Sequence, residues 1–466
     1  MAARTLRRGS TAVAGALGVA LALAACGGSS SGTDSAGASS SGGGNASAEC
    51  ADVAQYGTFK DAKVEIYSSI RDEEATRFEK SFELFQKCTG IDIQWNGTGE
   101  FETQLQVRVK GNNAPDLATI PQPGLLQTLV GLNAVKPASD KVKTASEANF
   151  SKDWLAYGTV NGTFYAPPLG ANVKSFVWYS PSMFKDNGWA VPQTWDELLK
   201  LSDTIAKSGK VDKPWCVGFE SGDASGWPGT DWIEDIMLRT QGTDVYDQWY
   251  QHKIPFNDPK VQDAFDKAGA ILKNPAFVNG GYGDVKSIAT TAFQDGGKPI
   301  IYGDCAMHRQ ASFYANQWPE GTKVAEDGDV FAFYLPPVDP AKGKPVLGGG
   351  EFLAAFNEKP ETQAVQLYMQ DGNWANAKAK LGDWIAPNKL LKKENVVSVT
   401  DGSPNPIQQL SLEILQDPNT VFRFDGSDLM PAAVGAGTFW KGMINWITGQ
   451  DTKTVTDAIE KSWPAS

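Results

Sequence analysis

The sequence has little histidine and lacks the motifs that position a nucleotide or a catalytic serine. Its 466 residues include two histidines, His252 and His308. A serine or cysteine triad would need one of them, and a site built from several histidines is excluded. No G-x-x-x-x-G-K-[ST] loop occurs, and the segment from Gly222 to Gly226 contains no G-x-S-x-G turn. A hydrolase with a carboxylate pair stays open as an alternative, because 54 Asp and Glu residues always supply a pair.

Cysteine is also scarce, with five residues in the chain. Cys26 follows an apolar segment and is treated with it below. The other four allow three disulfide connectivities. We expect Cys50–Cys88 and Cys216–Cys305, because each pair brackets one local unit of the chain. Reactive or metal-bound thiols are the alternative, but no two of these cysteines have the close spacing of zinc or redox sites.

Long apolar runs are missing too. The uncharged segment from Ala12 to Ala25 has 14 residues, whereas a membrane span needs about 20. It follows three arginines and ends in Leu23-Ala24-Ala25-Cys26, which looks like a bacterial lipobox. That resemblance implies a signal peptide over residues 1–25 and a diacylglycerol on Cys26 that anchors the chain to the outer face of the cytoplasmic membrane. A plain signal peptide and twin-arginine export through Arg7-Arg8 are the alternatives.

The remaining chain is acidic and begins with a flexible segment. Without the three arginines of the signal peptide it has 39 basic and 54 acidic residues, a net charge of about −15, which repels nucleic acid and anionic headgroups. Gly and Ser make up 15 of the 22 residues from Gly27 to Ala48, a composition typical of a tether. The roughly 415 residues that follow are too many for one core and indicate two lobes.

Alternating strands and helices follow Cys50. The pattern predicts strands at 63–67, 91–95 and 117–120, separated by helices at 73–87 and 102–110. This order implies a parallel sheet, in which ligands bind beyond the carboxyl ends of the strands. The loops expected there are 68–72, 97–101 and 121–124.

A second α/β unit and a mixed last third complete the pattern. Strands are expected at 175–179, 216–219, 299–302, 330–334 and 348–352. Helices are expected at 197–207, 231–239, 260–272, 287–294, 361–369, 406–415, 438–447 and 454–461.

Tryptophan is abundant, with 15 residues. Several lie next to Gly, Pro or acidic residues, among them Trp227 and Trp232, and Trp440 follows Phe439. A flat ring that stacks on the apolar face of a sugar, with carboxylates and amides nearby, suits a neutral carbohydrate. For Trp227 and Trp440 a place in the core is the equal alternative. The tryptophans expected in the core are Trp95, Trp178, Trp195 and Trp446.

Several segments, in order, carry a family resemblance. They are Phe85-Gln86-Lys87-Cys88-Thr89-Gly90-Ile91, then Gly111 to Asp116, Tyr165-Ala166-Pro167-Pro168 before Phe176-Val177-Trp178-Tyr179, and Leu429-Met430-Pro431 before Phe439-Trp440. From about Lys63 onward the chain resembles the extracellular solute-binding proteins of bacterial ABC sugar importers, in the maltose-binding class. The segments 226–235 and 308–313 resemble its α-glucoside-binding branch, whose substrates include sucrose, maltose and trehalose.

The resemblance implies an α/β fold of the two-lobed periplasmic-binding-protein type (type II, Venus-flytrap). Crossing hinge segments are expected near 170–174, 346–350 and 416–428. The expected division is a signal peptide at 1–25, a lipidated tether at 26–49, a first lobe at 50–171 and 349–416, and a second lobe at 172–348 and 428–466. Ligand would bind between the lobes.

The resemblance also implies twelve substrate-binding residues. They are Arg71, Asp72, Glu100, Gln122, Asn172, Lys174, Trp227, Asp231, His308, Arg309, Glu351 and Trp440. Relatives of the maltose-binding class tend to carry an aromatic ring where Met307 and His308 fall, so His308 is expected to hydrogen-bond. For Arg71, Asp72 and Glu100 a solvated loop charge is the alternative.

The implied activity is binding and not catalysis. A monomer anchored outside the cell would capture a small carbohydrate and deliver it to membrane permease subunits served by a separate ATPase. No cofactor or metal and no nucleic acid partner is expected. The alternatives are a receptor for another solute, such as an oligosaccharide or polyol, and a surface hydrolase.

Overall fold

The computed structural model describes residues 48–399, 401–417 and 420–464. The expected signal peptide, Cys26 and most of the expected tether lie outside the described residues. Ala48 and Glu49, which we assigned to the tether, instead begin a 3-10 helix, η1 (Ala48–Tyr56). Among the described helices, none is long and apolar enough to cross a membrane.

The first sheet has the order β12-β11-β3-β1-β2, and β6 pairs with β11. β1, β2 and β3 are parallel, as the alternating pattern predicted, whereas β11 runs antiparallel to β3 and β6. The strands are β1 (Ala62–Ser68), β2 (Ile91–Gly97), β3 (Leu117–Ile120), β6 (Pro168–Val173), β11 (Val346–Ala355) and β12 (Phe422–Phe424).

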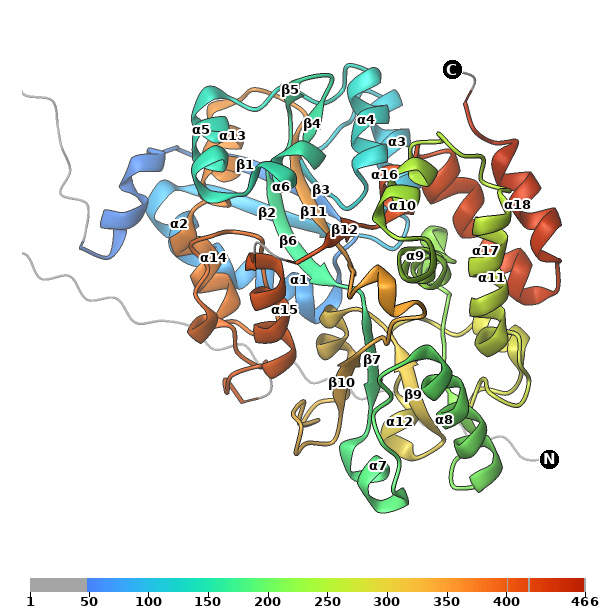
Figure 1. Ribbon diagram of the computed structural model, residues 1–466. Coiled ribbons are helices and arrows are strands. Elements are labelled where there is room, and N and C mark those ends of the chain that lie inside the picture. The colour runs from blue at the N-terminus through green and yellow to red at the C-terminus, as the bar shows by residue number, and fades with distance from the viewer. Residues whose placement is uncertain (1–47, 400, 418–419, 465–466) are drawn as a thin grey trace, which may run out of the picture. The chain divides into compact units, whose positions relative to one another are not determined.

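Helices cover both faces of this sheet (Figure 1). Val64 and Ile66 of β1 share one core with apolar residues of α1, α2, α13 and α14. Tyr67 lies in a second core with residues of α3 and α4. The period of two along β1 therefore separates two apolar faces. The helices and the small hairpin of this lobe are α1 (Asp72–Ser81), α2 (Glu83–Thr89), α3 (Phe101–Lys110), α4 (Pro123–Gly131), α5 (Asp140–Asn149), α6 (Lys152–Tyr157), β4 (Thr159–Val160), β5 (Thr163–Phe164), α13 (Pro360–Tyr368) and α14 (Gly372–Ala379).

The second sheet has the order β10-β7-β9-β8. Its strands are β7 (Phe176–Tyr179), β8 (Lys213–Trp215), β9 (Cys305–Arg309) and β10 (Phe331–Tyr334). Around it lie α7 (Pro181–Asn187), α8 (Trp195–Ser208), η2 (Gly222–Ala224), α9 (Trp227–Gln241), α10 (Thr243–Tyr250), α11 (Pro259–Leu272), η3 (Val285–Ala289), α12 (Pro299–Tyr302), η4 (Ser312–Gln317), η5 (Pro340–Lys342), α16 (Gly426–Leu429), the π-helix η7 (Val434–Phe439), α17 (Trp440–Thr448) and α18 (Thr452–Glu460). Most of these elements share one apolar core.

Three segments pass between the sheets. β6 continues into β7 through Lys174 and Ser175, and β10 leads into β11. A third segment follows η6 (Lys393–Asn395) and α15 (Pro406–Gln416) and returns through β12 to α16. β11 pairs with β6 on one side and β12 on the other near Gly348. The chain thus has the α/β fold of a two-lobed periplasmic binding protein, as expected.

Two strand predictions of the second lobe are wrong. Residues 216–219 are irregular, and the strand lies just before them as β8. Residues 299–302 form the short helix α12, and the strand is β9, three residues later. Pro299 fits the first turn of a helix, and Gly303 adopts the left-handed conformation that ends one. The apolar run 299–302 alone does not distinguish a strand from a buried helical turn.

Two helix predictions also differ from the structure. The helix expected at 73–87 is divided at Phe82 into α1 and α2. The helix expected at 287–294 is the 3-10 helix η3, which ends at Ala289. The remaining predicted helices are found within a few residues of their expected bounds.

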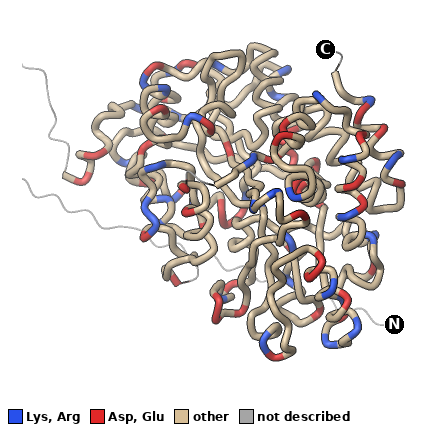
Figure 2. The backbone as a smooth tube through the Cα atoms, viewed as in Figure 1, with Lys and Arg blue, Asp and Glu red and all other residues tan. Residues whose placement is uncertain are grey.

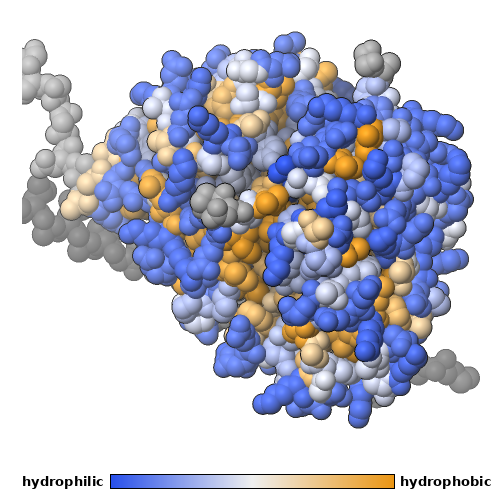
Figure 3. Space-filling model, in the orientation of Figure 1, coloured by the Kyte–Doolittle hydropathy of each residue, from blue (hydrophilic) through white to orange (hydrophobic). Residues whose placement is uncertain are grey.

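Figure 2 shows acidic and basic residues interspersed along the chain, so the net charge of −12 is not confined to one segment. The face in Figure 3 is mostly hydrophilic, with apolar side chains among the polar ones.

The two expected disulfides are present. Cys50 and Cys88 join η1 to α2 with a Cα–Cα distance of 5.6 Å. Cys216 and Cys305 join the segment after β8 to β9 with a distance of 5.8 Å. Both distances fit ordinary disulfide geometry.

Removing the first bridge tests how firmly η1 is held. We expect Cys50→Ser with Cys88→Ser to lower the unfolding free energy by about 2 kcal/mol, the low end of the usual range, because η1 is mostly exposed and buries mainly Val53 and Tyr56. Urea unfolding under non-reducing conditions measures the loss. An unchanged midpoint would show that those two side chains hold η1 without the bridge.

Candidate functional site

A cavity of about 430 Å³ lies between the two lobes. Its first-lobe wall includes the loops after β1, β2 and β3, represented by Arg71, Thr98 and Gln122. These are the loops at the carboxyl ends of the parallel strands. Residues of the second lobe, of the crossing strands and of the segment before α15 complete the wall. The position agrees with the general rule for ligand binding in parallel sheets.

Aromatic side chains form much of the second-lobe wall. Trp227 opens α9, and its ring centroid lies 5.1 Å from that of Phe293 and 6.0 Å from that of Phe313. Trp440 opens α17 and also lines the cavity. A Cβ on Gly226 would lie 2.0 Å from the Trp440 carbonyl oxygen, so this glycine, with φ 110°, lets the two segments meet.

Five side chains of the cavity wall carry a buried polar atom that has no hydrogen-bond partner among the described residues. The atoms are Arg77 Nε, Gln122 Oε1, Asn172 Oδ1, Gln408 Oε1 and Trp440 Nε1. Buried polar atoms without partners are costly, so such atoms in a cavity favour a ligand that can donate and accept hydrogen bonds. Sugar hydroxyls do both.

Lys174 sits where β6 passes into β7 and lies between two carboxylates. Its Nζ is 2.9 Å from Asp231 and 2.5 Å from Asp425. Burial opposes its charge, but Asp231 and Asp425 outweigh this effect and raise the pKa of Lys174 well above its usual value. The same Nζ lies 5.2 Å from the ring centroid of Trp227. Lys174 thus links the crossing segment to the aromatic wall.

A carboxyl group of the cavity is held close to neutral. Burial and then the nearby Glu74 raise the pKa of Glu351 to about 7. A protonated carboxyl can donate a hydrogen bond as well as accept one. Glu351 can therefore meet either end of a hydroxyl.

Eight of the twelve residues expected at the site line the cavity. They are Arg71, Asp72, Gln122, Asn172, Lys174, Trp227, Glu351 and Trp440. Cavity-lining residues that the sequence reasoning missed include Glu102, Phe293, Phe313, Trp384, Gln408 and Asp428. Phe313 lies in the segment 308–313, which carries part of the family resemblance. Glu102 lies one position beyond the expected loop 97–101.

Two of the expected residues, Asp231 and Arg309, lie outside the cavity wall. Arg309 is buried and pairs with Asp235 at 2.9 Å and with Asp231 at 3.6 Å. Asp231 lies behind Lys174 and does not reach the cavity wall, and burial raises its pKa to about 7. Both side chains therefore belong to the buried ion-pair network of α9 and β9.

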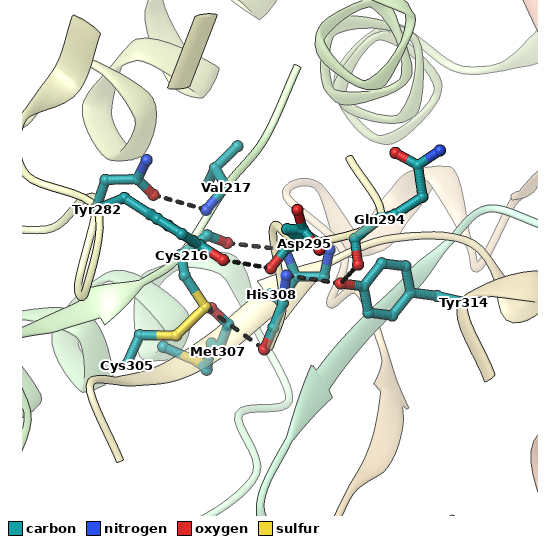
Figure 4. The surroundings of a disulfide bond; sticks show 11 residues. Cys216, Val217, Tyr282, Gln294, Asp295, Cys305, Met307, His308 and Tyr314 are labelled. Carbon is teal, nitrogen blue, oxygen red and sulfur yellow. Dashed lines mark hydrogen bonds between the residues drawn. A yellow bond between two sulfur atoms is a disulfide. The ribbon is translucent and has the colours of Figure 1, made fainter. Parts of the chain in front are cut away.

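His308 is not in the cavity wall either. It lies beside the Cys216–Cys305 bridge, where its Nδ1 donates to the Cys216 carbonyl oxygen at 2.8 Å (Figure 4). Burial lowers the pKa of His308 to about 4, so the ring is neutral at physiological pH. Its expected hydrogen bond is made to the backbone and not in the cavity.

Glu100 is exposed at the start of α3, outside the cavity. Its carboxylate accepts a hydrogen bond from Gln104 at 3.0 Å. It lines a separate, shallow surface groove with Glu65 and Arg108. Its position is that of a solvent-exposed charge, which is the alternative considered for this residue.

A cluster of three carboxylates has oxygens close enough together to suggest a metal site. Oxygens of Asp231, Glu234 and Asp425 lie within 4.8 Å of one another. Lys174 pairs with both Asp231 and Asp425, and Glu234 accepts the backbone N–H groups of Gly426 and Ser427 at 2.9 and 3.0 Å. Asp231 Oδ2 makes no hydrogen bond but lies 3.6 Å from Arg309, so cations or N–H groups of the protein already face all three carboxylates.

The comparison with known families agrees with this geometry. The model of the bacterial extracellular solute-binding proteins matches residues 71–375. The chain belongs to this family. It is the substrate-binding protein of an ABC sugar importer, a receptor that acts outside the cytoplasm and is not an enzyme.

Two curated relatives cover most of the chain. It is 38% identical over 406 residues to the osmoprotective compounds-binding protein GgtB of Synechocystis sp., covering 86% of this chain and 92% of that protein. It is 36% identical over 409 residues to the alpha-glucosides-binding periplasmic protein AglE of Rhizobium meliloti, covering 85% and 86%.

Solved structures of lower identity show the same fold. The solute receptor AcbH, described as exclusive for β-D-galactopyranose, matches with a TM-score of 0.71 at 20% identity and covers 86% of this chain and 97% of its own. Maltose-bound MalE3 of T. maritima matches with a TM-score of 0.64 at 16% identity and covers 86% and 98%.

Proposed function

We propose that the chain is a lipid-anchored receptor that captures a small α-glucoside and delivers it to an ABC permease. The observation that supports this proposal most is the cavity. Its wall combines Trp227 and Trp440 with polar atoms that lack hydrogen-bond partners among the described residues. Aromatic faces suit the apolar faces of pyranose rings, and amide and indole groups suit their hydroxyls. The α-glucoside-binding relative AglE supports this class of sugar.

In this proposal each part of the wall has its own task. Trp227 and Trp440 stack on the sugar, while Gln122, Asn172 and Glu351 bond its hydroxyls. Arg71 and Asp72 approach the sugar from the loop after β1. Cys26 carries the lipid, and the Gly/Ser-rich tether lets the receptor reach its permease.

An osmoprotective compound is the second candidate. The relative GgtB is named for binding such compounds. The cavity wall carries eight acidic side chains against four basic ones, and aromatic rings with carboxylates also suit a quaternary ammonium group. Glycine betaine tests this candidate.

Thermal melting against a panel of ligands tests both candidates. We expect maltose, sucrose or trehalose at millimolar concentration to raise the melting temperature, because a ligand stabilises by RT ln(1 + [L]/Kd). Glucose 6-phosphate is the matched control and should have no effect, because the wall is acidic. A shift with glycine betaine and none with the sugars would favour the second candidate, and no shift with any sugar would contradict the first.

A further inference from the structure

The two lobes touch at the rim of the cavity. A Cβ on Gly222 of η2 would lie 2.5 Å from the carbonyl oxygen of Gly99, in the loop after β2. The next residue, Asp223, accepts a hydrogen bond from the backbone N–H of Thr103 in α3 at 3.0 Å. η2 leads into α9 of the second lobe, whereas α3 covers the first sheet. This contact therefore forms only when the cavity is closed at this rim.

α3 has no cap of its own. Its N-cap residue, Glu100, makes no side-chain cap hydrogen bond, and the first backbone N–H groups of a helix need an acceptor from elsewhere. Asp223 supplies that acceptor from the other lobe. A carboxylate is also favourable at a helix N-terminus because it opposes the positive end of the dipole.

A second carboxyl group meets Asp223 at the same place. Glu102 is 9% exposed and accepts a hydrogen bond from Gln122 Nε2 at 2.8 Å, and it is the neighbour of Thr103, whose N–H binds Asp223. A like charge brought close to a carboxyl group disfavours the ionised form of that group. Burial and then Asp223 raise the pKa of Glu102 to about 7.

The other groups that face Glu102 supply it with no counter-charge. Asp428 of α16 is near enough to Glu102 to repel its charge, and Gln122 is neutral. Arg71 approaches the loop before α3, where a Cβ on Gly99 would lie 2.8 Å from its Nη1, but it has no ion pair with Glu102 or Asp223 among the described residues. Negative charge therefore predominates around Glu102.

We propose that Asp223 is a closure residue that caps α3 of the opposite lobe and brings its carboxylate beside the buried Glu102, so that sugar binding takes up a proton at Glu102. This rests on the proposed receptor function. In the open form Asp223 is withdrawn and Glu102 holds its proton less strongly, whereas in the closed form burial and Asp223 raise the pKa of Glu102 to about 7. Closure is thus fully favoured in acid and weakens as the pH rises through 7.

Calorimetric titration from pH 5.5 to 8.5, with the tightest ligand among maltose, sucrose and trehalose, tests this. We expect the wild-type affinity to fall about tenfold over this range, with uptake of about half a proton near pH 6.5 as measured in buffers of different ionisation enthalpy. E102Q should flatten the profile and abolish most of the proton uptake, because an amide does not titrate in this range. D223A should weaken binding about fivefold at pH 5.5, the size expected for a lost cap.

Asp451→Ala is the matched control. Asp451 caps α18 by accepting from the Thr454 N–H at 2.9 Å, within the second lobe, so its loss should leave the affinity and its pH profile unchanged. Wild-type affinity in D223A, or an unaltered pH profile in E102Q, would overturn the closure role while leaving the receptor function intact.

If no sugar of the panel binds, the receptor proposal fails and closure is measured without ligand. Energy transfer between dyes on cysteines replacing Val107 and Lys210, one exposed residue in each lobe, should be higher at pH 5.5 than at 8.5 and lose this difference in D223A. Equal energy transfer at pH 5.5 and pH 8.5 in the labelled protein that retains Asp223 would overturn the closure role.

Discussion

Lys174→Met is expected to lower the unfolding free energy by about 3–5 kcal/mol near neutral pH, the usual cost of leaving a buried charge without its partner. Lys174, Asp231 and Asp425 have side chains exposed by 7%, 0% and 2%. Arg309 remains 3.6 Å from Asp231 in the variant, so Asp425 is the group left without a counter-charge. Urea unfolding measures the loss.

The pH dependence of this loss identifies its cause. Burial opposes the charge of Asp425 in the wild type, but Lys174 and hydrogen bonds hold its pKa below the usual value. The pair therefore stabilises above the ordinary carboxyl range and is lost as the pH falls through it. Without Lys174 the pKa of Asp425 rises above its unfolded value, so the deficit of the variant should be largest near pH 8 and shrink toward pH 5.

Lys207→Met is the control for this prediction. Lys207 pairs with Asp203 at 2.6 Å, but the two side chains are 75% and 50% exposed, and such pairs contribute about 0.5 kcal/mol or less. A similar loss in both variants would mean that the buried position of Lys174 has no special role.

The order of the elements could be predicted because it follows from local patterns. Residues 78, 82 and 85 are all Phe and repeat at helical spacing in the region predicted as a helix at 73–87. Pro299 begins a helix where a strand was predicted at 299–302. Where local and long-range preferences compete, the sequence is ambiguous. The break at Phe82 and the irregular stretch after β8 belong to this class.

The site could be predicted only in part, because burial and pairing depend on distant residues. Lys174 lies 57 positions from Asp231 and 251 from Asp425. Nothing local distinguishes Asp231, which is consumed by this network, from Asp72, which faces the cavity. The tryptophans in the segments that resemble sugar-binding relatives were the more reliable signal, since Trp227 and Trp440 both line the wall.

His308 shows why residue type alone misleads. A histidine in a segment typical of sugar-binding relatives was expected to meet the ligand, yet the neighbouring β8 segment offers the Cys216 carbonyl oxygen to its Nδ1. Its Nε2 has no partner among the described residues, but the ring lies behind the wall. The disulfide that brings Cys216 to β9 fixes this contact.

Trp227→Ala is expected to weaken sugar binding by about 30- to 150-fold, which corresponds to about 2–3 kcal/mol for the lost apolar contact and stacking. Trp227 is only partly buried and lines the cavity with Phe293 and Phe313, so its truncation removes ligand contact more than core packing. Calorimetric titration with the tightest sugar of the panel, well below the melting temperature, measures the change.

Trp195→Ala is the matched variant, because it removes the same ring from a position in the second-lobe core at the start of α8. It should lower the unfolding free energy by about 3–5 kcal/mol and leave the affinity of the folded protein unchanged. The two tryptophans thus separate binding from stability. Equal losses of affinity in the two variants would show that Trp227 supports the lobe and does not touch the sugar. The aromatic wall would then no longer support the proposed function.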